Sequence, residues 1–189
     1  EEPGDRVMII LLAEHFLFFF ATIRSRLQHF ALDRIEPDQA QQYLHAHLPD
    51  LPNDQAKLLL NLSNQMPLLA IERHNAAWLA RRHEFAQDWQ KLVAEKNMPL
   101  FYATKWNKEL NFADFIQMFE YLLADLMALK LNHVTNNSDI DLRPLAEYYA
   151  LESLFNLYDE LQQAKRKLQQ NVQSNLLMDD LFIRLMNVS

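Results

Sequence analysis

Glycine is rare and cysteine is absent in this chain of 189 residues, and each absence excludes a class of chemistry. Glycine occurs once, as Gly4. Phosphate-cradling loops and dinucleotide fingerprints need several glycines at fixed spacing, so the chain cannot bind ATP by the usual device. The absence of cysteine excludes disulfides, thiolate metal sites and cysteine nucleophiles, and it fits a cytoplasmic protein.

Clustered positive charge and a membrane-length apolar run are also lacking. The formal net charge of -7 argues against the whole chain being a nucleic-acid-binding surface, because phosphate neutralisation needs clustered Lys and Arg. The most apolar run, Val7 to Phe20, is interrupted by Glu14 and His15, so it does not reach the roughly 20 apolar residues of a bilayer helix. We expect no membrane partner and, without a basic start and a small-residue cleavage site, no secretion signal.

What the chain does contain begins with an apolar segment and a polar turn. Val7 to Leu12 is a continuous run of β-branched and aliphatic residues, the pattern of a strand buried on both faces of a parallel sheet. We predict that Thr22 caps a short turn of helix that carries Arg24 and Arg26 outward. A guanidinium held there can bind phosphate or carboxylate bidentately; the alternative is that both arginines are solvated surface charges.

Prolines divide the next part of the chain into short predicted helices. A proline fits the first helical turn because its missing N–H costs least there. We predict helices over residues 37–47, 53–62 and 67–81, which together make a small bundle. The prolines that support helix starts along the whole chain are Pro37, Pro52, Pro67, Pro99 and Pro144.

Longer helices are predicted for the remainder. Apolar residues recur at helical spacing in four segments: one ending near Lys96, one from Phe112 to Leu129, one from Leu151 to about Asn175, and one from Leu177 onward. The loop 132–141 separates the second from the third. We expect an antiparallel helical domain with its Trp and Phe side chains in the core or in a subunit interface. The third predicted face consists of Leu151, Leu154, Phe155, Tyr158, Leu161, Leu168 and Val172.

Other candidate chemistry is sparse. His45 and His47 are two residues apart on a helix and therefore point to different faces, so they are poor metal co-ligands. Asp179 and Asp180 have no third partner at ligand spacing. The basic triplet 165–167 is interpreted as a solvated face, with a contact to a nucleic-acid backbone as the alternative. We predict no metal site and no cofactor in this chain.

Three strings resemble one family. Thr22-Ile23-Arg24-Ser25-Arg26 is similar to the serine–arginine motif of bacterial clamp-loader subunits, and Glu1-Glu2-Pro3 resembles the segment that precedes their sensor strand. Residues 59–70, LLNLSNQMPLLA, resemble the lid segment LRLSxGxP. In order and spacing the chain resembles the carboxy-terminal part of the delta-prime subunits of the DNA polymerase III clamp loader.

The resemblance implies a mainly α fold in three parts. Residues 1–35 would be the remnant of an α/β AAA+ core with one or two strands, 36–75 a helical lid, and 76–189 a helical collar for oligomerisation. Residues upstream of the EEPG start would have been left out. We expect residues 1–35 to be poorly ordered, because a lone strand leaves backbone donors unpaired.

The sequence departs from the family pattern at three positions. Leu27 stands where the family has cysteine, and Phe20 lies where Leu or Pro is usual. Gln65 replaces the lid glycine. If the backbone there has positive φ, a residue other than glycine costs on the order of 1 kcal/mol.

The family also implies roles for individual residues. Arg26 resembles the arginine finger given in trans to the ATP of a neighbouring ATPase subunit, and Ser25 would orient the turn. Leu68 lies near the position of the sensing arginine of ATP-using relatives, so this chain would have no catalytic site of its own and take no nucleotide. ATP and Mg²⁺ would be bound by partner subunits. The partners would be gamma/tau and delta clamp-loader subunits through the collar, and the sliding clamp and primed DNA through the whole DNA polymerase III holoenzyme, in the cytoplasm.

Two alternatives stay open. The first is an ATP-using gamma or tau clamp-loader subunit, which has a similar motif; the missing lid arginine speaks against it. The second is an all-helical interaction module with no part in replication, in which the motif at residues 22–26 is a chance match. This second alternative leaves the apolar run and the Glu-Glu-Pro string before the motif unexplained.

Overall fold

A computed structural model describes residues 7–12, 19–28, 35–170 and 172–187. The chain divides into two units, residues 1–34 and 35–189, which are described separately. The described residues are mainly helical and contain no strand. None of their helices is both long enough and apolar enough to cross a bilayer.

The described part of the first unit contains one short helix, α1 (Ala21–Arg24). Residues 7–12 carry no strand, and all six side chains are exposed, from 45% for Leu11 to 87% for Leu12. The predicted strand is therefore not confirmed, and the exposed side chains agree with the expectation that an apolar strand without its sheet is left uncovered. A strand buried on both faces needs neighbouring strands, and the described residues contain none. The rest of the predicted core remnant lies outside the described residues or stays a prediction.

The second unit begins with three short helices: α2 (Pro37–His47), α3 (Asn53–Leu62) and α4 (Pro67–Asn75). The predicted helices over 37–47 and 53–62 are confirmed. Both α2 and α4 start with proline, whose fixed φ suits the first helical position. Their buried side chains form one small cluster, which consists of Ala40, Leu44, Leu51, Ala56, Leu59, Leu60 and Ala70.

The predicted single helix over 67–81 is wrong, because the chain bends after Asn75. Helix α4 ends there, and α5 (Trp78–Glu95) begins after two intervening residues, Ala76 and Ala77. Ala77, between them, is left-handed with φ 52°. A left-handed residue other than glycine costs roughly 1–2 kcal/mol, so tertiary contacts must hold this bend against the local preference for helix.

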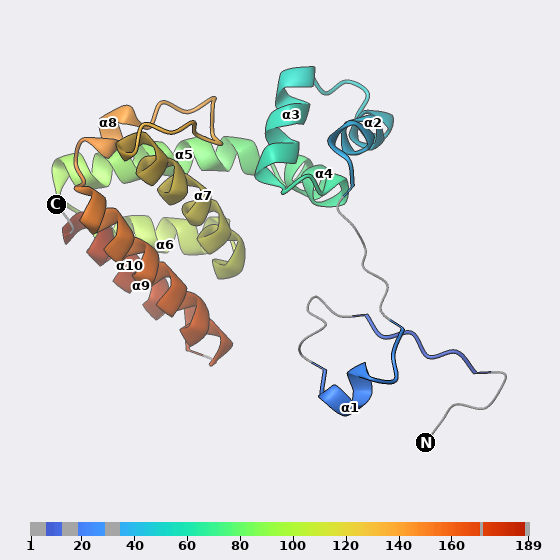
Figure 1. Cartoon of the computed structure of the whole chain (residues 1–189). Coiled ribbons are helices and arrows are strands. Elements are labelled where there is room, and N and C mark those ends of the chain that lie inside the picture. The colour runs from blue at the N-terminus through green and yellow to red at the C-terminus, as the bar shows by residue number, and fades with distance from the viewer. Residues whose placement is uncertain (1–6, 13–18, 29–34, 171, 188–189) are drawn as a thin grey trace. The chain divides into compact units, whose positions relative to one another are not determined.

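The remaining helices pack with α5 into a bundle (Figure 1). They are α6 (Pro99–Glu109), α7 (Phe112–Lys130), α8 (Arg143–Ala146), α9 (Leu151–Gln169) and α10 (Ser174–Asn187). Helix α6 lies along α10, and α7 lies along α9. The predicted helix starts at Pro99 and Pro144 are confirmed, each proline being in the first turn. Asn111 caps α7 by accepting a hydrogen bond from the Asp114 N–H at 2.9 Å.

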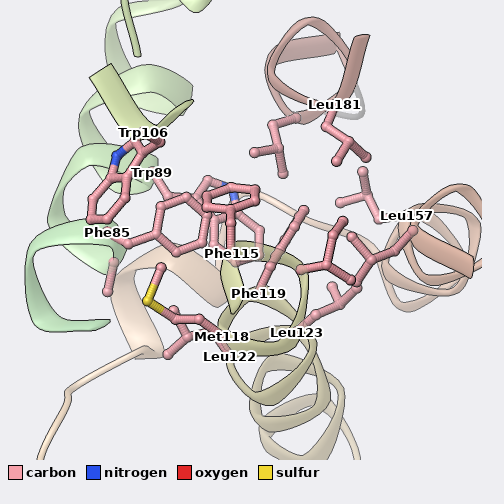
Figure 2. Close-up of a cluster of buried hydrophobic side chains, with 14 of the residues drawn as sticks. Phe85, Trp89, Trp106, Phe115, Met118, Phe119, Leu122, Leu123, Leu157 and Leu181 are labelled. Carbon is pink, nitrogen blue, oxygen red and sulfur yellow. The ribbon is translucent and has the colours of Figure 1, made fainter. Parts of the chain in front are cut away.

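The bundle encloses a core rich in aromatic rings. Figure 2 shows Phe115 and Phe119 of α7 between the tryptophans of α5 and α6 on one side and Leu157 and Leu181 on the other. The predicted Trp and Phe faces of α5 and α7 are confirmed as core, since Phe85, Trp89, Phe115 and Phe119 are fully buried. These rings meet mostly edge to face, an arrangement that aromatic quadrupoles favour.

The predicted face of α9 needs correction. Phe155 is 50% exposed and Tyr158 is 38% exposed, whereas Leu157 and Ala164 join Leu154 and Leu161 in the core. The sequence offers apolar residues on two adjacent faces of this helix, and only the position of α7 and α10 decides between them. The helix also ends at Gln169 instead of near Asn175, with the N–H of Val172 bonded back to the Lys167 carbonyl.

The backbone at Gln65, in the turn after α3, does have positive φ. Asn64 has φ 51° and Gln65 has φ 61°. The Gln65 N–H donates to the Leu60 carbonyl at 2.8 Å, the bond that closes a helix through a left-handed residue. Glycine and asparagine tolerate this region, but glutamine does not. The Gln65 side chain recovers part of the cost by donating to Asn61 Oδ1 at 2.9 Å.

Gln65→Gly is expected to stabilise the protein. Removing the Cβ from a left-handed residue relieves about 1 kcal/mol, while the lost bond to Asn61 is exposed and contributes less. The urea midpoint should rise accordingly. Gln163→Gly, at an exposed position inside α9, is the matched control and should cost about 1 kcal/mol. Equal losses for the two variants would contradict backbone strain at Gln65.

Candidate functional site

The candidate site is the turn formed by α1 and the three residues after it. The N–H groups of Ile23 and Arg24 donate to the Phe20 carbonyl, and the Ser25 N–H donates to Ala21 at 3.0 Å. The Arg26 N–H donates to the Ile23 carbonyl, also at 3.0 Å. One turn of α-helix therefore continues as a tighter turn through Arg26, and the motif from Thr22 to Arg26 is a single folded loop.

The side chain of Ser25 stabilises this loop through a hydrogen bond. Its hydroxyl donates to the Thr22 carbonyl at 3.2 Å, so the serine and threonine of the motif are joined directly. The predicted cap by Thr22 is wrong: Phe20 occupies the N-cap position, no side-chain cap bond forms, and Thr22 lies inside the first turn. Thr22 contributes its carbonyl instead, because a residue within the helix cannot cap the helix's own start.

The two arginines differ in their surroundings. Arg26 is exposed, and among the described residues its side chain has no hydrogen-bond or ion-pair partner. Arg24 is half-buried, and its Nε atom is buried without a partner in the same described part. An exposed guanidinium on a turn presents its fork of donors to a planar anion. The geometry therefore makes Arg26, more than Arg24, the group that could meet a phosphate or carboxylate.

Several other residues considered from the sequence are engaged locally, whereas the Nε2 atom of His45 is buried with no hydrogen-bond partner among the described residues. His47 makes a 2.9 Å bond between its Nδ1 and the Tyr43 carbonyl, and its ring stacks on Tyr43. Asp180 pairs with Arg184 at 3.0 Å. Lys165 of the basic triplet pairs with Glu120 at 2.5 Å. Leu68, near the expected lid position, is 68% exposed. None of these residues is brought near another to form a site.

A buried polar network was not predicted from the sequence. Arg82 of α5 is fully buried and donates to Asn137 and, at 2.5 Å, to the Asp139 carboxylate. Asp125 of α7, also fully buried, accepts the backbone N–H groups of Asn136 at 2.8 Å and Asn137 at 2.6 Å. The network ties the loop 132–141 to two helices. The asparagines and aspartates of that loop predicted a turn, but nothing in the sequence paired them with Arg82.

Burial and charge act in opposite directions on this network. Burial lowers the pKa of the Arg82 guanidinium, and the bond to Asp139 only partly restores it. Burial acts to raise the pKa of Asp139, but the hydrogen bond and charge of Arg82, helped by His83 at 2.9 Å, outweigh it and leave that pKa below its ordinary value. The pair is therefore ionised at neutral pH and held by a charge-assisted bond.

A pocket of about 220 Å³ lies beside the network. Its polar lining comes from His83, Gln87 and Gln90 of α5 and from Asp139 and Asp141 of the loop. Asp139 is already bound by Arg82 and His83, and Asp141 by Arg143 at 2.8 Å. Its charged groups are thus satisfied within the chain, and the lining specifies no ligand. Within the described ranges, no group of three or more His, Cys, Asp or Glu could hold a metal ion.

Acid is expected to weaken the loop attachment through Asp139. Because the pKa of Asp139 is lower in the folded than in the unfolded chain, the unfolded chain takes up the proton first. The contribution of ionised Asp139 to the free energy of unfolding is fully present above about pH 4. It is lost as the pH falls through the lowered pKa of Asp139 in the folded chain. Urea unfolding between pH 7 and pH 3 should show the gap between the wild-type protein and Asp139→Asn narrowing at the acid end. Asp159→Asn, on α9, is the control, and a gap independent of pH would contradict the assignment.

No protein-family model, no curated protein and no solved structure matches the chain.

Proposed function

We propose that the chain is a delta-prime-type subunit of a DNA polymerase III clamp loader, which gives an arginine finger to a neighbouring ATPase subunit. The observation that carries the proposal is the turn at residues 22–26, where Arg26 is exposed and Ser25 closes the loop through the Thr22 carbonyl. The family resemblance rests on these same residues. The mainly helical body after residue 35 is compatible with the lid and collar that the resemblance implies.

The proposed chemistry needs only charge and position from this chain. When ATP is cleaved in the partner's site, negative charge spreads over the oxygens of the transferring γ-phosphoryl group. The Arg26 guanidinium would donate two parallel hydrogen bonds to those oxygens and stabilise that charge. It stays protonated throughout, so it neither takes nor gives a proton. Ser25 acts through the loop, because its hydroxyl fixes the backbone that carries Arg26.

ATP and Mg²⁺ belong to the partner in this proposal. The chain's single glycine leaves no phosphate-cradling loop. Binding to the partner would come from the helical collar, placed in the chain after residue 75. Contacts with the sliding clamp and primed DNA would be made through the assembled complex, which is compatible with the net charge of -7.

Arg26→Ala is expected to leave assembly intact and to slow hydrolysis at the one partner site that faces it. An arginine finger in other nucleotidases is worth about 10³ to 10⁵ in rate. Single-turnover ATP hydrolysis by the reconstituted complex, with clamp and primed DNA present, should lose the corresponding phase. The complex with Arg26→Lys should hydrolyse ATP little faster than the complex with Arg26→Ala, since an ammonium lacks the bidentate fork. Arg24→Ala is the matched control, and hydrolysis unchanged by Arg26→Ala would remove this residue from the mechanism.

Association with the ATPase subunit is expected to occur without nucleotide. Size-exclusion chromatography of this chain, alone and mixed with the cognate gamma-type subunit, measures it directly. Co-elution is the expected result, because the collar helices and not Arg26 would supply the contact area. Separate elution of a chain that circular dichroism shows to be folded would favour the unrelated helical module.

A further inference from the structure

The bend between α4 and α5 opposes the local sequence. Ala76 and Ala77 are followed by Trp78, Leu79 and Ala80, and alanine is the best helix former. These residues would continue α4 into α5 without a break. Ala77 instead takes the left-handed conformation, with φ 52° and ψ 30°, which its Cβ disfavours. The bent arrangement therefore depends on contacts made elsewhere.

Arg73 makes the polar contacts that hold the bend. This residue of α4 is only 4% exposed, and its Nη1 donates to the Leu62 carbonyl and, at 3.3 Å, to the Ser63 hydroxyl. Leu62 is the last residue of α3, and its carbonyl has no partner within that helix. The guanidinium carbon also lies 4.5 Å from the ring centre of Trp78 in α5 and 5.3 Å from that of Tyr121 in α7. A single side chain thus joins α3 and α4 to the start of α5 and to α7.

Apolar packing supports the same arrangement. Leu58 and Leu62 of α3 belong to the large cluster that contains Trp78, while Leu59 and Leu60 belong to the small cluster of α2–α4. Leu79 packs against both clusters. The two clusters therefore meet around the bend, and a straight α4–α5 helix would separate them there.

The contact made by Arg73 is incomplete. Its Nη2 atom is buried and has no hydrogen-bond partner among the described residues. A buried donor left unpaired destabilises the arrangement that buries it. Two unfavourable features, the left-handed Ala77 and the unpaired Nη2, thus oppose the favourable contacts of the bent form. Straightening the helix would remove the first and release the second to solvent.

We propose that Ala76 and Ala77 form a two-state hinge and that the contacts of Arg73 stabilise its bent state. In the other state α4 and α5 join into one helix over residues 67–95, and α2–α4 take a new direction relative to α5–α10. The orientation of the three short helices is then an equilibrium that a binding partner can shift. This proposal is independent of the clamp-loader function and concerns the chain alone.

The experiment is a spin-label distance measurement on the whole chain. Because the sequence contains no cysteine, Leu68→Cys and Lys91→Cys place one label on each helix at exposed positions. In a continuous helix these positions are about 35 Å apart at the rise of one helical residue, and any bend makes the distance shorter. The labelled protein should show mainly the shorter distance. Arg73→Gln should add a second population near the helical value, about a tenth of the molecules or more.

Substitutions at Ala77 test the hinge from the backbone side while keeping Arg73. Ala77→Val should also add the longer distance, because a β-branched residue tolerates the left-handed region least. Ala77→Gly should leave only the shorter distance and raise Tm by about 2–4 °C. Ala80→Gly, an exposed position inside α5, is the matched control and should lower Tm by a similar amount.

Arg81→Gln is the matched arginine control. Arg81 also donates to a backbone carbonyl, that of Glu109, but it lies beyond the bend. Arg81→Gln should therefore leave a single population at the shorter label–label distance. The proposal is overturned if Arg73→Gln and Ala77→Val lower Tm yet keep a single short distance. Arg73 would then be a packing residue of a fixed bend. Should Arg73→Gln fail to fold, the distances in the two Ala77 variants decide the matter.

Discussion

The packing around the Phe85 ring is the interaction on which the larger helical body depends. This fully buried ring meets Trp106 of α6, Phe119 of α7 and Phe182 of α10 within 6.2 Å of their centres. Four helices, the consecutive α5, α6 and α7 together with the distant α10, therefore share one contact point. Aromatic side chains bury large areas at low entropic cost and favour edge-to-face geometry, so this cluster fixes which face of each helix turns inward. Helix α9 packs against two of these helices, α7 and α10, whose positions leave Phe155 and Tyr158 exposed.

Polar contacts then fix what the aromatic core leaves undetermined. Arg82 and Asp125 tie the loop 132–141 to α5 and α7, and Arg73 ties the end of α3 to α5. Arg82 and Arg73 are buried charged groups whose desolvation is partly offset by hydrogen bonds and by a carboxylate or a ring, and buried Asp125 accepts hydrogen bonds from Asn136 and Asn137. Such contacts define orientation more sharply than apolar packing, because a hydrogen bond fails when its geometry changes. The two buried arginines therefore fix the positions of the loop 132–141 and of the end of α3, which apolar packing alone leaves less well defined.

The candidate site differs from the larger helical body in the kind of contact that forms it. The turn from Thr22 to Arg26 is made from local hydrogen bonds, none spanning more than four residues. An exposed arginine on such a turn keeps its full set of donors for an external anion. In the proposed function this is useful, because the site that Arg26 completes would belong to another subunit.

Local rules in the sequence determined the helices at 37–47 and 53–62 and the core face of α7, whereas the expectation of strain at Gln65 came from the resemblance to a lid segment that has glycine there. Proline position and the helical spacing of apolar residues act within a few residues, so they can be predicted without a fold. Tertiary structure alone decided the bend at Ala77, the inward face of α9 and the pairing of Arg82 with Asp139. Each of these depends on partners far apart in the chain, and only packing brings such partners together.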